Sequence, residues 1–165
     1  MPVGSFWTQP AGEPHITSAK GEGTMAYIEI DNGPYLVNPT NESFDHGERP
    51  INFDASNIVW LDNTQTNWIS ANNQSKVSFL WKNAEDVRGV LVKLPSHFKG
   101  NIYSKGTILY GVIIEGNVDY KMPNLDAVTN LDAGSFFEST GNSVHEISTT
   151  KEALIYIRTN DKIEI

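Results

Sequence analysis

The chain has 165 residues, and its 20 Asp and Glu against 12 Lys and Arg give a formal net charge of -8. This acidic balance repels phosphate backbones, so the sequence predicts no nucleic-acid partner. The absence of cysteine excludes disulfides, thiolate catalysis and cysteine-ligated zinc. No stretch approaches the roughly 20 apolar residues of a membrane span, and the first residues do not resemble a signal peptide, so we expect a cytoplasmic protein without membrane contact.

Short apolar segments, rich in Val, Ile, Tyr, Phe and Trp, alternate with Gly, Asn, Asp and Pro along the chain. This pattern predicts an all-β sandwich or barrel. Only fragments such as Asn124–Leu131 fit a helical pattern, and the polar stretch Pro39–Asp54 is expected to be a connection. The expected strands are Met25–Ile30, Tyr35–Val37, Ile58–Leu61, Lys76–Trp81, Gly89–Leu94, Thr107–Glu115, Val118–Met122, Ser143–Ser148 and Ala153–Arg158.

One segment occurs twice. Gly4–His15 returns as Gly134–His145, and both copies begin with Gly-Ser-Phe and reach a histidine eleven residues later. An internal repeat indicates duplicated structure. A long strand-rich stretch precedes the second copy, whereas the first begins close to Met1, so the sequence predicts that the N-terminal unit is only half of a repeat.

The first copy has a specific spacing: Gly4, five residues, Pro10-x-Gly12, two residues and then His15. This spacing resembles the second sequence motif of the cupins, which are small jelly-roll β-barrels. The resemblance implies that the glycines and the proline shape a turn between strands. It also implies that the histidine projects into the barrel mouth, where in cupins it usually completes a metal site.

Three further segments, 4–10, 44–50 and 55–60, resemble the ChrR-like family of uncharacterised two-cupin proteins. Members of that family carry two complete barrels. The resemblance therefore implies an RmlC-like jelly-roll β-barrel at residues 51–165, preceded by a partial cupin unit and its connection at residues 1–50. It also leaves open that the chain is an incomplete reading of a longer gene.

In the complete barrel, the cupin resemblance locates the first-motif metal positions by counting back from Gly116, which gives Leu109, Lys105 and Tyr103. These residues do not form the set of imidazoles and a carboxylate that a first-row metal needs. His145 is then left without partners, and a lone histidine does not hold a metal. We therefore expect no cofactor, with His15 and His145 as the weak metal-ligand candidates.

The same positions predict a ligand pocket in the barrel mouth. Its expected lining is Tyr103, Lys105, Leu109, Glu138 and His145, and Tyr103 and His145 could hydrogen-bond a small polar ligand. A buried lysine amine can attack carbonyl groups, but pairing of Lys105 with Glu138, or extension of its ammonium group to water, is the favoured interpretation.

The other histidines receive similar interpretations. His15 fits its motif, but its partners would come from strands that this chain lacks, unless another chain supplies them. His46 lies in a turn with Asp45 and Glu48, where an Asx-type loop is favoured over a metal site. His97 occupies a turn position where the cupin pattern has a glycine, and we expect it to be a surface loop residue.

Two functions are consistent with these patterns. The favoured one is a non-enzymatic cupin-like protein with a degenerate metal site that could bind a small molecule in the barrel. The alternative is a metal-dependent cupin enzyme of the dioxygenase or hydrolase type, with zinc or iron held by ligands from two subunits. In either case the apolar residues between 27 and 37 are expected to be buried against another surface. A twofold interface between two copies is the commonest way to bury such a patch, so the sequence predicts a symmetric homodimer.

Overall fold

A computed structural model describes residues 1–19, 21–30, 33–122 and 125–165. The chain divides into a larger unit, Met1–Ser5 with Asp54–Ile165, and a smaller unit, Phe6–Phe53. Within the described residues the regular secondary structure consists of strands and two single-turn 3-10 helices, η1 (Thr40–Glu42) and η2 (Ala55–Asn57). The all-β prediction is therefore confirmed. In the same residues, no helix has the length and hydropathy that a membrane crossing requires.

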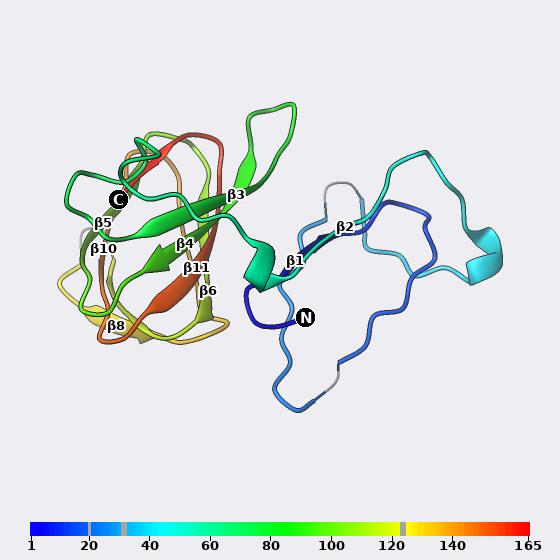
Figure 1. The fold of residues 1–165 in the computed structure, drawn as a ribbon, viewed down its shortest axis with the longest axis horizontal. Helices are drawn as coiled ribbons and strands as arrows, with labels where there is room; N and C mark the ends of the chain where they lie inside the picture. The colour runs from blue at the N-terminus through cyan, green and yellow to red at the C-terminus, as the bar shows by residue number, and fades with distance from the viewer. Residues whose placement is uncertain (20, 31–32, 123–124) are drawn as a thin grey trace. The chain divides into compact units, whose positions relative to one another are not determined.

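The larger unit contains two five-stranded antiparallel sheets (Figure 1). The first has the strand order β12-β5-β10-β7-β8 and the second has the order β3-β4-β11-β6-β9, so neighbours in a sheet are rarely neighbours in sequence. This is the sandwich form of a jelly roll. The strands are β3 (Lys76–Lys82), β4 (Arg88–Leu94), β5 (Lys99–Ser104), β6 (Leu109–Glu115), β7 (Val118–Lys121), β8 (Val128–Leu131), β9 (Phe136–Ser139), β10 (Val144–Ser148), β11 (Ala153–Thr159) and β12 (Ile163–Glu164).

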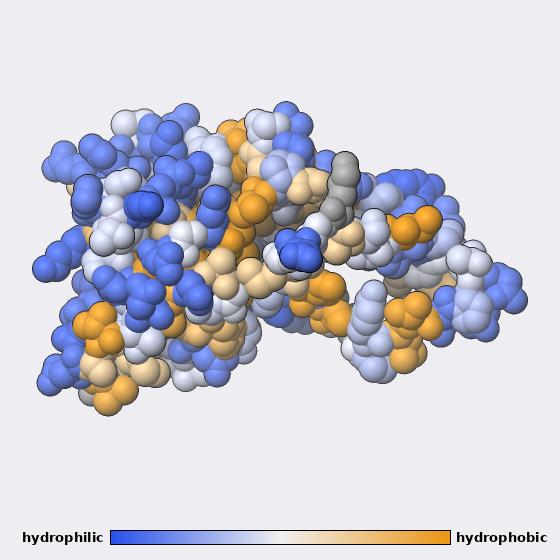
Figure 2. All heavy atoms as spheres, turned by 90° about the horizontal axis from the view of Figure 1, so that it is seen from below, coloured by the Kyte–Doolittle hydropathy of each residue, from blue (hydrophilic) through white to orange (hydrophobic). Residues whose placement is uncertain are grey.

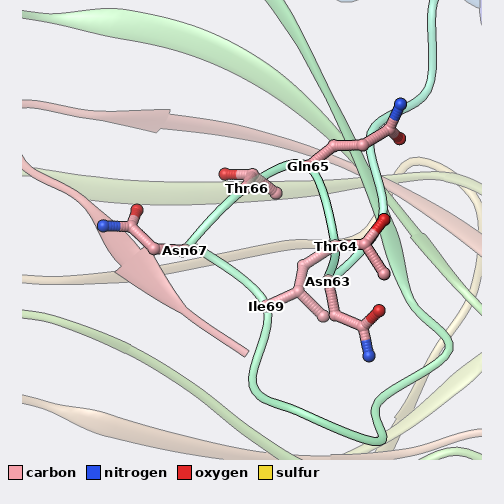
Figure 3. Close-up of a pocket in the computed structure, with 6 residues that line it drawn as sticks. All are labelled: Asn63, Thr64, Gln65, Thr66, Asn67 and Ile69. Atoms are coloured by element: carbon pink, nitrogen blue, oxygen red, sulfur yellow. The ribbon is translucent and has the colours of Figure 1, made fainter.

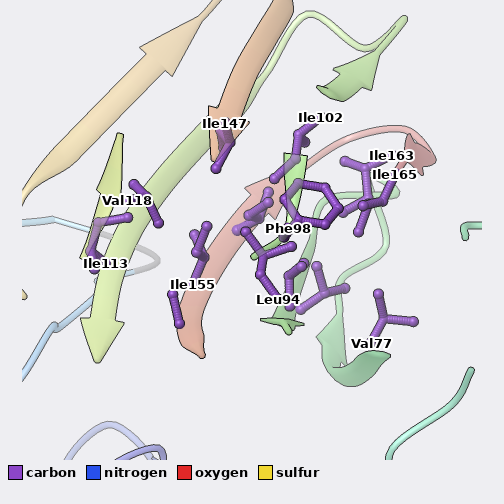
Figure 4. Close-up of a cluster of buried hydrophobic side chains, with 14 of the residues drawn as sticks. Val77, Leu94, Phe98, Ile102, Ile113, Val118, Ile147, Ile155, Ile163 and Ile165 are labelled. Atoms are coloured by element: carbon purple, nitrogen blue, oxygen red, sulfur yellow. The ribbon is translucent and has the colours of Figure 1, made fainter. Parts of the chain in front are cut away.

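The core lies between the two sheets. Figure 4 shows side chains of one buried cluster, among them Ile102 and Ile147 from the first sheet and Ile113 and Ile155 from the second. In β10 the side chains alternate, with exposed Val144 and Glu146 on one face and buried His145 and Ile147 on the other. Each sheet thus contributes its inward-facing set to one apolar core, which is the main source of stability.

The outer face of the second sheet is also partly covered. Leu91, Leu154 and Tyr156 form a second buried cluster, against which Ile58 and Trp60 pack. The expected strand Ile58–Leu61 is wrong, because this segment makes only one bridge, from Leu61 to Val77, and otherwise lies across the sheet. Its apolar residues cover the sheet face instead of extending the sheet edge.

The smaller unit contains one short antiparallel pair, β1 (Phe6–Thr8) with β2 (Ile51–Phe53). The expected strands Met25–Ile30 and Tyr35–Val37 are wrong, because the structure gives these residues no regular secondary structure. β-propensity alone does not make a strand when no neighbouring strand supplies hydrogen bonds. Apolar side chains here remain exposed, up to 81% for Val37, and Figure 2 shows such hydrophobic residues at the surface in orange.

Several strands of the larger unit were not expected. β5 contains Gly100 and Asn101, and β8 lies at a sheet edge with exposed residues, so neither has a strong apolar alternation. The helix-like fragment Asn124–Leu131 instead contains the strand β8, while Asn124 itself lies outside the described residues. The strands β9 and β12 of the larger unit were also not expected, nor were β1 and β2 of the smaller unit.

The sequence repeat is accompanied by repeated turns. Gly4 has φ +82° and Gly134 has φ +91°, conformations that glycine adopts without strain. The amide of the following residue closes the same turn in both copies, from Ser5 to the carbonyl of Pro2 at 3.2 Å and from Ser135 to that of Asp132 at 2.9 Å. Further along, Gly12 and its counterpart Asn142 both have positive φ values, +77° and +45°.

Candidate functional site

His145 lies on β10 and is fully buried between the sheets. Its Nδ1 atom is 2.7 Å from the hydroxyl oxygen of Tyr120 on β7. Its Nε2 atom is 2.8 Å from the hydroxyl oxygen of Ser139, at the end of β9. Both ring nitrogens therefore have a side-chain partner, and the three residues form a network that links the two sheets.

Aromatic packing holds this network in place. The ring of Tyr120 stacks on that of Phe137 with a centroid distance of 5.0 Å, and the Phe137 ring lies 5.2 Å from that of His145. Phe137 is paired across the sheet with Gly111 of β6, and its ring occupies the space that a side chain at Gly111 would need. A glycine at this position thus lets the aromatic ring reach the histidine.

Burial sets the charge state of the site. Desolvation lowers the pKa of His145 to about 4 and raises the pKa of the Tyr120 hydroxyl, so both groups are neutral near pH 7. A neutral imidazole offers one donor and one acceptor. We assign Tyr120 as the donor to Nδ1, because its buried proton then has a partner, and Nε2–H as the donor to Ser139. The Ser139 proton is then available to another acceptor.

Two of the predicted pocket residues face the interior, Leu109 and His145, both almost fully buried. The expected inward orientation of Tyr103, Lys105 and Glu138 is corrected by the structure. Lys105 and Glu138 are exposed, and Tyr103 is half-buried and donates its hydroxyl to Asn142 at 3.0 Å, at the surface. The ammonium group of Lys105 and the carboxylate of Glu138 therefore do not line the space between the sheets.

The correction has a simple geometric cause. On β5 the buried side chains are those of Ile102 and Ser104, and side chains alternate between the faces of a strand. The loop from Ser104 to Leu109 holds four residues, 105–108, whereas the sequence count placed Lys105 on the strand and left three residues between it and Leu109. One extra loop residue shifts the predicted register by one position and so reverses the face.

With this register, the count by the cupin motif falls on Ile102, Ser104 and Leu109 in place of Tyr103, Lys105 and Leu109, with His145 from the second motif. Ile102 and Leu109 carry no ligand atom, and the hydroxyl of Ser104 already accepts a hydrogen bond from the amide of Gly106 at 3.1 Å. His145 is engaged on both nitrogens, so these four residues do not fit a transition metal. Nowhere among the described residues do three His, Cys, Asp or Glu side chains gather in a way that could hold a metal ion.

The other three histidines are exposed. The Nδ1 atom of His15 lies 3.1 Å from the carbonyl oxygen of Glu13. Next to His46, the side chain of Asp45 accepts the Gly47 amide at 2.6 Å, as an Asx-type turn requires, and pairs with Arg49 at 3.0 Å. These hydrogen bonds lower the pKa of Asp45, and the bond from the Gly47 amide has the largest effect.

His97 lies in the turn between β4 and β5 with φ +59°. This left-handed conformation agrees with the glycine that the cupin pattern has at the same place. The turn is closed by a hydrogen bond from the Phe98 amide to the carbonyl of Pro95 at 3.3 Å. His97 is therefore a surface turn residue, as expected.

The network partners Tyr120 and Ser139 were not predicted from the sequence. Ser139 lies within the second copy of the repeated segment, but the first copy has Gln9 at this place, so the repeat did not single it out. Tyr120 had no sequence signal beyond its place in an expected strand.

A shallow pocket at the loop Asn63–Ile69 was also not predicted. It is lined mainly by amide and hydroxyl side chains, which Figure 3 shows pointing away from one another. Because these polar groups diverge, they do not converge on a ligand.

Comparison with protein families gives one match over the whole chain, residues 1–165, to a family described as a domain of unknown function, DUF4437. The chain belongs to the DUF4437 family. Comparison with curated proteins gives no match. The description of the family names no biochemical activity.

Solved structures similar to this DUF4437 chain include cupins. An RmlC-like cupin from Ralstonia eutropha JMP134 is 15% identical, with a TM-score of 0.51 over 67% of this chain and 68% of that one. An RmlC-like cupin from Shewanella frigidimarina is 14% identical, with a TM-score of 0.48 over 61% and 87%. The cupin domain of Schizosaccharomyces pombe Cnp3 is 17% identical, with a TM-score of 0.47, and the match spans 56% of this chain and 65% of that one. The predicted RmlC-like cupin fold is confirmed.

Proposed function

We propose that this DUF4437 chain is a non-enzymatic cupin-like protein in which a hydrogen-bonded network replaces the metal centre of the fold. The observation that carries the proposal is the engagement of both nitrogens of His145, by Tyr120 at 2.7 Å and by Ser139 at 2.8 Å. A metal ligand needs a free lone pair on one ring nitrogen and further ligands nearby. Ile102 and Leu109 supply none.

A small polar molecule remains the proposed ligand of the barrel interior. Among the residues predicted for this pocket, Leu109 and His145 face the interior, and Ser139 adds a hydroxyl whose proton is not used by His145 in our assignment. An acceptor oxygen on the ligand could take this hydrogen bond. Tyr103, Lys105 and Glu138 could contact such a ligand only from outside the sheets.

The test is metal content and metal response. We expect the purified protein to contain far less than one transition metal per chain by inductively coupled plasma mass spectrometry. Addition of Zn²⁺ or Fe²⁺ should leave the melting temperature unchanged, because a ligand stabilises a protein only when it binds the folded state. A near-stoichiometric metal that is lost in His145→Ala would overturn the proposal and favour the metal-dependent dioxygenase or hydrolase alternative.

We further propose that residues 1–50 are a partial cupin unit related to the ChrR-like two-cupin proteins, in a cytoplasmic homodimer. Support for the partial unit comes from the matching turns at Gly4 and Gly134 and at Gly12 and Asn142. Support for the dimer comes from exposed apolar side chains in the smaller unit, such as Ile28, Leu36 and Val37. Light scattering after size exclusion tests it, and a monomer at all concentrations would contradict it.

A further inference from the structure

A pocket of about 660 Å³ lies on the larger unit, at the end of β6 opposite to His145. The turn after β6 meets the turn before β11 there, and Gly116 allows this approach, because a side chain at Gly116 would come within 2.6 Å of the Glu152 carbonyl oxygen. The volume is in the range of small-molecule sites. Its lining includes Ile58, Trp60, Lys93, Glu115, Asn117 and Leu154.

One side of this pocket is apolar. Ile58, Trp60 and Leu154 belong to the cluster on the outer face of the second sheet, and Gly4 packs closely on Leu154. The side chains of Ile58 and Trp60 are only partly buried, so they present carbon surface to the pocket. Such a wall contacts C–H groups favourably.

The other side carries oriented polar groups. The ammonium group of Lys93 lies 4.8 Å from the centre of the Trp60 ring and 3.7 Å from a carboxylate oxygen of Glu152. The side-chain amide of Asn117 donates to Asn130 at 3.2 Å. An ammonium group has three protons, and an amide has a carbonyl oxygen as well as its protons, so both retain donors or acceptors for a ligand.

The charges of the lining residues cancel, since Lys93 and Lys151 oppose Glu115 and Glu152. A phosphate or a polyanion would need an excess of positive charge, and a cation would need the reverse. The pocket therefore fits a neutral molecule that combines an apolar face with a rim of hydroxyl groups. A pyranose ring has this arrangement, because its axial C–H bonds form one face and its hydroxyls point outward.

We propose that this pocket binds a neutral mono- or disaccharide, with the sugar's C–H face on the Ile58–Trp60–Leu154 wall. Its hydroxyl groups bind the side chains of Lys93, Asn117 and Glu115. The site lies at the other end of the sandwich from the Tyr120–His145–Ser139 network. It is independent of the function proposed for the barrel interior, so failure of one leaves the other unaffected.

The experiment is an NMR titration of the full chain labelled with ¹⁵N. The probes are D-glucose, D-galactose, D-mannose, N-acetyl-D-glucosamine, maltose and cellobiose, and the signals are the Trp60 indole N–H and the Asn117 side-chain amide. At least one sugar should shift both signals to saturation. If none of these sugars produced a saturable shift, the proposal would be overturned. Equal shifts with inorganic phosphate would also overturn it, in favour of an anion site.

Variants localise the binding. Asn117→Ala, in an exposed turn, should weaken the sugar affinity about tenfold, the effect of one lost hydrogen bond. Lys93→Met keeps the aliphatic stem beside Trp60 and should have a similar effect. The matched control is Asn101→Ala, an exposed asparagine on β5 outside the pocket, which should leave the affinity unchanged. Unchanged binding in both pocket variants would show that the sugar binds elsewhere.

Discussion

The hydroxyl oxygen of Tyr120 lies 2.7 Å from Nδ1 of His145, and both side chains are buried between the two sheets. This hydrogen bond needs one donor and one acceptor, so it fits a neutral imidazole beside an intact tyrosine. An imidazolium would have protons on both nitrogens and would face the Tyr120 hydroxyl in a buried position that disfavours its charge. The pair therefore links the charge state of His145 to the stability of the core.

Folding stability should fall as the pH drops from 6.5 towards 4. The pKa of His145 is lowered from 6.5 to about 4 in the folded protein, so below pH 6.5 the unfolded chain binds a proton that the folded chain refuses. The stabilisation of the folded protein by neutral His145 is fully present above pH 6.5. It is lost as the pH falls to the pKa of His145 in the folded protein. The loss is roughly 3 kcal/mol, at about 1.4 kcal/mol per pH unit. Urea denaturation across this range measures it.

His145→Gln provides the control for that pH dependence. Glutamine can donate and accept hydrogen bonds at this position but does not titrate, so the difference in unfolding free energy between the two proteins should shrink by roughly 3 kcal/mol from pH 6.5 to 4. The exposed histidines His15, His46 and His97 are common to both proteins and cancel in this difference. A difference independent of pH would contradict the buried neutral state of His145.

Tyr120→Phe should destabilise the protein by about 1 to 3 kcal/mol at pH 7. The phenylalanine ring keeps the stacking on Phe137, but Nδ1 of His145 loses its partner in a buried position. Tyr110→Phe removes the same atom from a half-buried ring on β6 and should cost less. Equal losses in the two variants, measured by chemical denaturation, would argue against a special role of the Tyr120 hydroxyl.

The sequence predicted the strands of the larger unit best where two signals agree. β3, β4, β10 and β11 are short apolar segments with turn residues at their ends, such as Asn83 after β3 and Pro95 after β4. The direction in which Tyr103 and Lys105 point could not be obtained in this way, because it depends on the length of one loop. A period of two makes every register error of one residue a change of face.

The network around His145 was only half predictable. Its position in a repeated motif identified His145 itself, and Leu109 was expected inside and lies there. Tyr120 and Ser139 come from two other strands, and only strand order brings them together. In the smaller unit, residues 25–30 have strong β-propensity but no strand to pair with, which the sequence cannot reveal.

Gly116→Ala should destabilise the larger unit by more than Gly141→Ala. Both glycines have positive φ, +81° and +63°, so both substitutions carry a backbone cost of about 1 kcal/mol. Only at Gly116 does the new methyl group also meet the backbone of Glu152 and Ala153, whereas at Gly141 the nearest atom is 3.9 Å away. The comparison uses thermal unfolding, and equal shifts would mean that the two turns near Gly116 can separate without cost.

Residues 25–30 and 35–37 should exchange their amide hydrogens much faster than β4 and β11 when the protein is dilute. No strand pairing protects them in the structure, while β4 and β11 lie in the middle of a five-stranded sheet. If a second copy covers their apolar side chains, protection of these two segments should rise with protein concentration and that of β4 should not. Hydrogen exchange with mass spectrometry at several concentrations measures both. Fast exchange at every concentration would contradict the proposed homodimer while leaving the fold of the larger unit untouched.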